Sequence, residues 1–272
     1  MTGRPRVGFH ALGVADVTPL TADAVRITFA VPPDLAEAFA HRPGQHLTIR
    51  TAIDGARLMR RYSICSPARS GTLQIAVKRR QGGVFSRHCV ERLRAGDVLD
   101  VMTPMGGFTA ALEPERGRHH AGVAVGSGIT PLRSISMSVL AHEPDSRVTL
   151  VCANRTHAST MFRADLDELA ARHPGRFDLV HVLSEEPPSG APNGALHGRL
   201  EPDLLAAIAR RKGLLAAADV WYLSGPYELM DALKARLAAE GVDESAVLTE
   251  SFLRPENEPP RGVRVPQSSS AS

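Results

Sequence analysis

The stretch AGVAVGSGITPLRSISMSVLAHE, residues 121–143, combines an apolar strand pattern, a Gly-x-Gly turn and a helical pattern. Glycines let the backbone approach a pyrophosphate closely, and a helix N-terminus offers free N–H groups and a partial positive charge. The turn therefore predicts a dinucleotide site, although Pro131 stands where the third glycine of G-x-G-x-x-G would fall. A tight structural turn is the competing interpretation of the glycine pair.

Downstream of this stretch, apolar strand patterns alternate with helical patterns. Further strands are expected at 147–153, 177–184, 219–225 and 245–252. Further helices are expected at 161–173, 200–212 and 226–241. Such alternation is typical of a parallel, doubly wound sheet, so a Rossmann-like α/β domain is predicted.

The first part of the chain has a different pattern of apolar residues. Short alternating patterns separated by turn residues predict strands at 24–31, 45–53, 72–79 and 97–104, with one helix at 86–94. This spacing favours a β-barrel or sandwich. We therefore expect domains at 1–113 and 119–252 joined by a linker at 112–120, and a disordered Pro/Ser-rich tail at 253–272.

The composition indicates a globular protein. The chain has 272 residues, of which 43% are hydrophobic and 22% charged, as in globular proteins. No apolar run approaches the roughly 20 residues of a membrane span. The N-terminus has no long apolar stretch, so no signal peptide is predicted and a cytoplasmic location is expected.

The three cysteines exclude a site made of four thiolates. Cys65, Cys89 and Cys152 share no CxxC spacing, whereas a Cys-ligated iron–sulfur cluster needs four ligands. His119 and His120 are expected in the linker with no third ligand nearby. We therefore expect no metal site, and any redox chemistry would use a bound organic cofactor.

Positive charge is concentrated in residues 57–94, which hold ten Arg and Lys residues against a single Glu91. Such a face attracts phosphates or an acidic partner, although a solvated Arg-rich surface is the alternative. Nucleic acid is disfavoured, because only 4% of residues are aromatic and no RNP-like or helix-turn-helix pattern is present.

Within this region, RRYSICSP at 60–67 carries residues suited to a flavin nucleotide. On a strand, Arg60 and Tyr62 point to the same side. A guanidinium suits a diphosphate, an aromatic ring suits stacking on a planar ligand, and the hydroxyl of Ser63 can hydrogen-bond a ring nitrogen. Taken alone, the pattern is equally that of a half-exposed barrel strand.

The motifs R-x-Y-S, VKR followed by GGVFS, GSGITP, SGP and E-x-F occur in this order along the chain. That order resembles the ferredoxin–NADP reductase superfamily over about residues 8–252. The chain most resembles the flavin reductase components of bacterial oxygenases, of the phenylacetyl-CoA epoxidase and 3-ketosteroid 9α-hydroxylase types. The resemblance implies an FAD-binding antiparallel barrel followed by an NAD(P)-binding domain.

The resemblance also implies a role for each matching residue. Those expected to contact FAD are Arg60, Tyr62, Ser63, Ala76, Val77, Lys78, Gly83, Val84, Phe85, Ser86 and Phe252. Those expected at the nicotinamide are Gly126, Ser127, Gly128, Ile129, Thr130, Pro131, Gly225 and Pro226. Ser63, Ser224 and Glu250 would act in catalysis. Ser63 would steady flavin N5, Ser224 would help place the nicotinamide, and Glu250 would stabilise the reduced state or take part in proton supply.

Two departures from the family pattern stand out. Ser224 occupies the position where the family commonly has Cys; it can still donate a hydrogen bond, but hydride transfer could be slower. The relatives of oxygenase type continue into a ferredoxin domain with four cysteines, whereas this chain ends in a Pro/Ser-rich stretch. We expect either a separate electron acceptor or a truncated form.

The residues after the second Rossmann strand bear on the choice of nucleotide. There the family reads the adenosine ribose, and Arg155, Thr156 and Arg163 are suited to a 2′-phosphate. No Asp or Glu follows the strand directly to prefer a free 2′-hydroxyl, which somewhat favours NADPH over NADH. A solvent-exposed Arg163 is the alternative.

These features predict an FAD-dependent NAD(P)H oxidoreductase that passes single electrons to a separate, acidic ferredoxin or oxygenase component. A stand-alone flavin or quinone reductase is one alternative. A non-catalytic nucleotide-binding module is another. The oligomeric state and the physiological acceptor are not predicted by the sequence.

Overall fold

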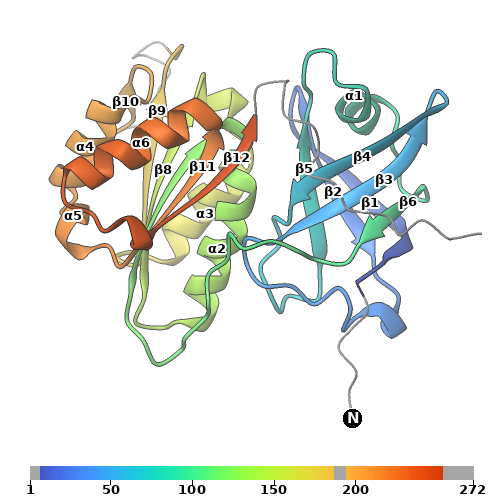
Figure 1. Cartoon of the computed structure of the whole chain (residues 1–272), viewed down its shortest axis with the longest axis horizontal. Coiled ribbons are helices and arrows are strands. Elements are labelled where there is room, and N and C mark those ends of the chain that lie inside the picture. Colours follow the sequence, from blue (N-terminus) through green and yellow to red (C-terminus); the bar gives the residue numbers. More distant parts are fainter. Residues whose placement is uncertain (1–6, 187–193, 254–272) are drawn as a thin grey trace, which may run out of the picture.

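The structure is a computed structural model in which residues 7–186 and 194–253 are described. The predicted tail lies outside the described residues except for Leu253, which ends a strand. The chain forms two bodies that lie side by side, an antiparallel half-barrel and a parallel sheet flanked by helices (Figure 1). No helix in these two ranges is long and apolar enough to cross a membrane.

Six antiparallel strands in the order β4-β3-β6-β1-β2-β5 form the half-barrel. Their bounds are β1 (Phe9–Thr21), β2 (Ala24–Ala30), β3 (His46–Ile53), β4 (Ala56–Ser63), β5 (Leu73–Lys78) and β6 (Val98–Met102). Alternate side chains such as Ile27, Leu47 and Ile49 fill one core. The helix α1 (Val84–Glu91) lies over one end of the sheet (Figure 1). The predicted barrel is confirmed.

Strand β1 is the element of the barrel that the sequence pattern did not reveal. It is 13 residues long and only Leu12 and Val14 are buried along it. A register shift between Val14 and Asp16 interrupts its pairing with β2. Because a β-bulge moves the following side chains to the other face, the alternation of polar and apolar residues is lost there.

The second body is a six-stranded parallel sheet in the order β10-β9-β8-β7-β11-β12. Its strands are β7 (His119–Val125), β8 (Arg147–Asn154), β9 (Phe177–Leu183), β10 (Leu196–His197), β11 (Val220–Pro226) and β12 (Val247–Leu253). Its helices are α2 (Ile129–His142), α3 (Arg163–Arg172), α4 (Pro202–Arg211), α5 (Leu214–Ala217) and α6 (Tyr227–Ala239). The predicted doubly wound α/β domain is therefore confirmed, and α5 and β10 are additional short elements.

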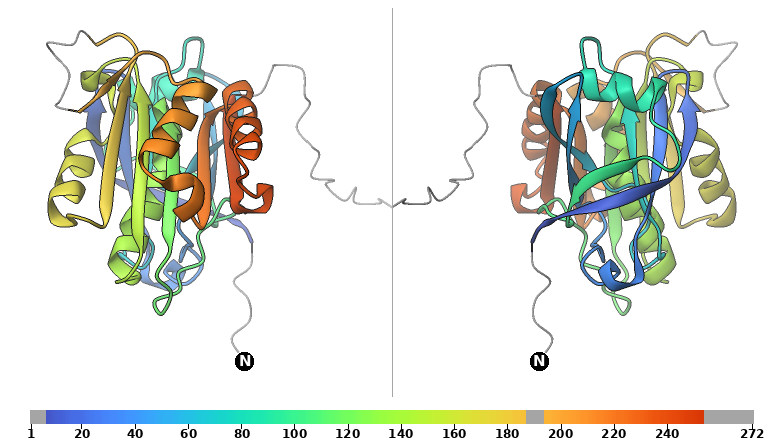
Figure 2. Two further views of the ribbon diagram at one scale, coloured as in Figure 1. Left: turned by 90° about the vertical axis from the view of Figure 1, so that its left-hand side faces the viewer. Right: turned by 90° about the vertical axis from the view of Figure 1, so that its right-hand side faces the viewer.

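Helices cover both faces of this sheet (Figure 2). Leu132 of α2 and Leu166 of α3 belong to the core on one face. Leu205 of α4 and Leu233 of α6 belong to the core on the other face. The strands are buried between these layers, which explains their nearly continuous apolar sequences.

The expected linker at 112–120 extends too far. His119 and His120 are the first residues of β7, and their exposed fractions are only 7% and 1%. The buried carboxylate of Glu143 fixes the segment that precedes β7. It accepts a hydrogen bond from the N–H of Glu113 at 2.9 Å and pairs with Arg118. Two adjacent histidines resemble a polar linker in sequence, but here they are buried and hydrogen-bonded.

Candidate functional site

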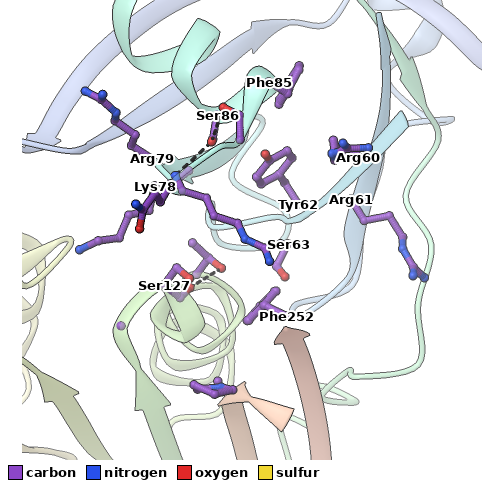
Figure 3. A pocket seen from close by; sticks show the side chains of 18 of the residues that line it. Arg60, Arg61, Tyr62, Ser63, Lys78, Arg79, Phe85, Ser86, Ser127 and Phe252 are labelled. Carbon is purple, nitrogen blue, oxygen red and sulfur yellow. Dashed lines mark hydrogen bonds between the residues drawn. The ribbon is translucent and has the colours of Figure 1, made fainter. Parts of the chain in front are cut away.

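One pocket of about 730 Å³ lies where the half-barrel meets the parallel sheet (Figure 3). Its barrel wall comes from β4, β5 and the start of α1. Its opposite wall comes from the carboxyl ends of β7 and β11 and the turn before α2. Ligands of open α/β sheets bind at the carboxyl ends of the strands, so both the place and the volume suit a small-molecule site.

Strand β4 places Tyr62 and Ser63 at the pocket. The Tyr62 ring is half-buried and packs against Phe85 of α1, with 5.5 Å between ring centroids. Burial raises the pKa of the Tyr62 hydroxyl, so the ring stays neutral at physiological pH. Arg60 projects on the same side of the strand as Tyr62 and is exposed, and its guanidinium donates to the carbonyl of Met59 at 2.9 Å.

The loop between β5 and α1 has a geometry that suits an anion. Gly82 has φ +71°, in the left-handed region, and a Cβ at this position would meet nothing within 4 Å. Gly83 precedes α1 and no side chain caps the helix there. Ser86 Oγ accepts from the N–H of Arg80 at 3.1 Å and donates to the carbonyl of Gly83 at 3.2 Å. The first N–H groups of α1 are thus free of side-chain partners and lie at the pocket wall.

Alternation along β5 separates its predicted residues. Ala76 and Lys78 line the pocket, whereas Val77 is fully buried in the barrel core. The ammonium of Lys78 lies 3.4 Å from Asp23 and donates to the carbonyl of Ser159 at 3.4 Å, across the boundary between the two bodies. Of this triplet, Val77 therefore has a packing role.

On the opposite wall, the turn after β7 contributes Gly126, Ser127 and Thr130. Gly126 has φ +56°, which a side chain rarely adopts, and the hydroxyl of Thr130 donates to the carbonyl of Ser127 at 3.0 Å. Gly128 is buried beneath this surface. A Cβ on Gly128 would lie 2.0 Å from the carbonyl oxygen of Ser224, so the glycine allows α2 to begin directly against β11.

Strand β11 contributes Gly225 and Pro226 to the pocket. A Cβ on Gly225 would lie 2.9 Å from the Cβ of Val125, so the close approach of β7 requires a glycine there. Ser224 is fully buried behind the wall, and its Oγ has no hydrogen-bond partner among the residues that the structure describes. Its predicted contact with the nicotinamide stays a prediction.

Ser63, which lines the pocket, contacts Glu250 across the boundary between the two bodies. Ser63 is 2% exposed, and its hydroxyl donates to Glu250 Oε2 at 2.8 Å. Burial raises the pKa of the Glu250 carboxyl to about 7, while the hydrogen bond from Ser63 and the charge of Arg61 act in the opposite direction. A carboxyl that titrates near neutrality can hold or release a proton under physiological conditions.

The predicted nucleotide turn after β8 lies outside this pocket. Arg155 and Arg163 are exposed, and Thr156 caps a short 3-10 helix by accepting from the N–H of Ser159 at 3.2 Å. The carboxylate of Glu186, which follows β9, accepts from the N–H of His157 at 2.6 Å. A carboxylate therefore does contact this turn, although no Asp or Glu directly follows β8. It belongs to Glu186, which follows the neighbouring strand β9.

Most predicted residues share the pocket. Those that line it are Arg60, Tyr62, Ser63, Ala76, Lys78, Gly83, Val84, Phe85, Ser86, Gly126, Ser127, Thr130, Gly225, Pro226 and Phe252. Those that do not are Val77, Gly128, Ile129, Pro131, Arg155, Thr156, Ser224 and Glu250. Lining residues to which the sequence analysis assigned no cofactor contact are Arg61, Arg79, Arg80, Gln81, Gly82 and Val125. Arg79 to Gly82 stand between two predicted segments, so a signal for them was present in the sequence.

None of the three cysteines lines the pocket. Cys65, Cys89 and Cys152 are buried and unpaired, and burial raises the pKa of each thiol to about 12. Such thiols are inert at neutral pH. Over residues 7–186 and 194–253, no group of three His, Cys, Asp or Glu side chains could hold a metal ion.

The residues of the barrel wall fit a flavin dinucleotide. The free N-terminus of α1, the loop at Gly82 and the neighbouring guanidinium groups suit a diphosphate. The Tyr62 ring suits a planar ring system, and the Ser63 hydroxyl suits a polar edge of that ring. Among the described residues, no charged side chain lines the opposite wall of this pocket, which suits the uncharged dihydropyridine ring of a reduced nicotinamide.

Comparison with known proteins agrees with this assignment. Residues 11–110 match the family model described as "Oxidoreductase FAD-binding domain", and residues 123–235 match "Oxidoreductase NAD-binding domain". The chain resembles a subunit of 1,2-phenylacetyl-CoA epoxidase from Escherichia coli, with 39% identity over 94% of this chain and 71% of that protein.

Two further proteins are similar. The ferredoxin reductase component of 3-ketosteroid-9-alpha-monooxygenase from Rhodococcus rhodochrous is 35% identical over 89% of this chain and 64% of that protein. The FAD/NAD-binding domain of nitric oxide dioxygenase from Vibrio cholerae superposes with a TM-score of 0.77 over 91% of this chain and 99% of that domain, at 24% identity. The chain therefore belongs to the ferredoxin–NADP reductase family and is an NAD(P)H-dependent flavin oxidoreductase.

Proposed function

We propose that this chain takes a hydride from NADH or NADPH onto bound FAD and delivers single electrons to a separate redox protein. The observation that carries the proposal is a pocket with two unlike walls, one suited to a flavin dinucleotide and the other to a nicotinamide. When bound, FAD would supply the exchange between two-electron and one-electron transfer that no amino-acid side chain provides.

The barrel wall would hold FAD. Arg60 and the N-terminus of α1 would bind its diphosphate, and Tyr62 would pack beside its ring. On the other wall, the turn at Gly126–Gly128 and Thr130 would bind the nicotinamide nucleotide. Because both walls face one cavity, the two rings would be held together with water excluded between them.

Ser63 and Glu250 would form the proton relay of the site. Their 2.8 Å hydrogen bond crosses from β4 to β12, so it links the two bodies beside the reacting rings. The Glu250 carboxyl, with a pKa of about 7, would hold a proton at mildly acidic pH and release it through Ser63. Ser63 would also orient the flavin ring edge by donating or accepting at one atom.

The electron acceptor would be an acidic ferredoxin or oxygenase component. The named relatives belong to an epoxidase and a monooxygenase, which supports an acceptor of this class. Arg57, Met59 and Arg61 alternate along the edge strand β4 with Arg60 and Tyr62, and all three are exposed. Met59 is 54% exposed, and Arg61, at the pocket rim, extends away from Tyr62 (Figure 3). A basic strip with an apolar residue beside the flavin site suits an acidic partner.

The direct test uses the purified full chain loaded with FAD. We expect a visible absorption spectrum of oxidised flavin, which bleaches under anaerobic conditions when NADH or NADPH is added. A colourless protein that cannot be loaded with FAD would contradict the proposal. If the flavoprotein reduces a small quinone but no ferredoxin, only the first part of the proposal, the reduction of FAD by NADH or NADPH, would stand.

The partner is tested with an acidic plant-type ferredoxin as the probe. We expect the rate of ferredoxin reduction to fall as salt rises, because opposite charges steer the encounter. The variant Arg57→Gln, outside the pocket lining, should weaken this salt dependence while flavin reduction by NADH keeps its rate. A rate of ferredoxin reduction that is independent of salt in the parent chain would contradict an acidic partner.

A further inference from the structure

Helix α2 is hydrogen-bonded to the barrel as well as to its own sheet. The side chain of Arg133 is only 7% exposed, and its Nη1 donates to the carbonyl of Cys65 at 2.6 Å. Cys65 lies two residues after Ser63 of the flavin wall. A guanidinium so far removed from water is stable only when its N–H groups and its charge are matched, so this contact fixes the position of both partners.

A second set of contacts holds Arg133 from the other side. Its Nε donates to Asp165 Oδ2 of α3 at 2.9 Å, and its guanidinium lies 4.7 Å from the centre of the Phe162 ring. Phe162 has φ +59°, an unfavourable conformation for a bulky residue, and is 2% exposed. Such a conformation persists only when its surroundings impose it. Contacts with Asp165 and Phe162 therefore orient the guanidinium toward the barrel.

Two serines of α2 bind the same barrel segment. The hydroxyl of Ser134 donates to the carbonyl of Ser66 at 2.7 Å, and the N–H of Ala68 donates to Ser138 Oγ at 2.8 Å. Ser134 and Ser138 are one helical turn apart and both are fully buried. With Arg133 they make three hydrogen bonds to residues 65–68, and we call this set of contacts the α2 seam.

The α2 seam lies close to the nicotinamide wall. Arg133 is one helical turn after Thr130, which lines the pocket, and the helix starts against β11 through Gly128. A helix is stiff over such a distance. The turn that would hold the nicotinamide is thus connected through a few rigid bonds to Cys65, and from there to Ser63 on the flavin wall.

We propose that Arg133 is a positioning residue, which sets the separation between the nicotinamide wall and the flavin wall through its bond to the Cys65 carbonyl. The inference rests on the proposed function, because that separation matters only if a hydride crosses it. Transfer between two held groups is sensitive to displacement, and an error of about 1 Å can cost a hundredfold in rate.

The test compares Arg133→Gln with the parent chain, both loaded with FAD, in stopped-flow reduction by NADH and by NADPH. We expect the rate at saturating nucleotide to fall about 10- to 100-fold, while the nucleotide concentration for half-saturation changes less than about threefold. The primary kinetic isotope effect, measured with nucleotide deuterated at the transferred position, should rise because hydride transfer becomes the slow step. A purely structural role would lower the thermal midpoint and leave both readouts unchanged.

Arg176→Gln is the matched control. Arg176 donates to the carbonyls of Ser146, Leu140 and Glu143, so it holds the end of α2 from within the α/β body. We expect it to lower the thermal midpoint and to keep the parent rate and isotope effect. Ser134→Ala is a milder variant of the seam, which we expect to keep the parent fold and to lower the rate about threefold.

The outcomes separate the two proposals. If neither nucleotide reduces the parent chain, the proposed function fails. If the parent is reduced but Arg133→Gln matches it in rate and isotope effect, only the positioning role is overturned. Should Arg133→Gln fail to fold, an unchanged rate in Ser134→Ala would overturn the seam, and a reduced rate with a raised isotope effect would support it.

Discussion

The two walls of the pocket differ in the way they offer binding groups. The barrel wall carries five cationic side chains, Arg60, Arg61, Lys78, Arg79 and Arg80, together with the Tyr62 and Phe85 rings. The wall from the parallel sheet offers small or uncharged residues, among them Gly126, Ser127, Thr130 and Gly225. One wall is therefore suited to binding through side-chain charge, and the other to binding through shape.

This difference corresponds to two residence times, a long one for the flavin and a short one for the nicotinamide nucleotide. A resident cofactor is retained through strong charge-assisted contacts to its diphosphate. A nicotinamide nucleotide must leave after each turnover, so a wall lined by uncharged residues at the reacting ring allows exchange. The comparison predicts that changes on the barrel wall alter FAD affinity, whereas changes on the opposite wall alter the rate of reduction.

The largest effect is expected for Gly128→Ala. The added Cβ would lie 2.0 Å from the carbonyl oxygen of Ser224, so the start of α2 must move away from β11. We expect reduction by NADH or NADPH to slow at least about 100-fold, because the nicotinamide turn is displaced, while the FAD content of the purified protein is retained. Gly107→Ala, where a Cβ meets nothing within 4 Å, is the control. Loss of FAD together with the rate would show that the walls are not separable.

The converse change is Arg60→Ala on the barrel wall. A hydrogen bond from a charged group contributes about 1.5–3 kcal/mol, so the dissociation constant of FAD should rise about 10- to 100-fold. Once loaded at high FAD, the variant should be reduced by NADH within a few-fold of the parent rate. Arg57→Ala, on the same strand but away from the pocket lining, should keep the parent FAD affinity in equilibrium dialysis.

An intermediate effect is expected at the contact between the walls, where Glu250 titrates with a pKa of about 7. If the protonated carboxyl is the active form, turnover should fall about tenfold from about pH 6 to about pH 8, and Glu250→Gln should flatten the profile. The raised pKa means that the folded chain binds more protons than the unfolded chain between about pH 4.5 and 7. Stability relative to Glu250→Gln should therefore decline as pH rises through this window and stay constant above it, as thermal midpoints would record.

The smallest effect concerns nucleotide choice at the turn after β8, away from the pocket. Exposed charges contribute about 0.2–1 kcal/mol, so Arg155→Ala should lower kcat/KM for NADPH about two- to fivefold and leave that for NADH unchanged. Glu186→Gln should raise the value for NADPH, because a carboxylate near the turn repels a 2′-phosphate. If either variant changes kcat/KM equally for NADH and NADPH, the adenosine ribose of the nucleotide does not bind at this turn.

The local parts of this site could be predicted from the sequence. The Gly-x-Gly turn at 126–128, the pair Gly82–Gly83 before α1 and the strand with Tyr62 each lie within a few consecutive residues, where geometry follows from residue type. Strand and helix positions in the α/β domain were predicted well for the same reason, because continuous apolar runs between helical patterns have few alternatives.

Contacts between distant residues could not be predicted. The bond between Ser63 and Glu250 joins residues 187 positions apart, and the tight approach of Gly128 to Ser224 depends on the packing of α2 on β11. Alternation along β5 also gave Val77 a core position rather than a contact with the pocket. These features depend on how the two bodies fold and meet, which no local pattern encodes.

The α2 seam has a consequence for recombination. Its three hydrogen bonds end on main-chain atoms of the barrel, the carbonyls of Cys65 and Ser66 and the N–H of Ala68. Main-chain carbonyls are present whatever residues occupy those positions, and the N–H at position 68 is present for every residue except proline. A foreign barrel with the same backbone course could therefore offer the same three main-chain partners to α2, so the seam suits the construction of chimaeric reductases with exchanged flavin modules.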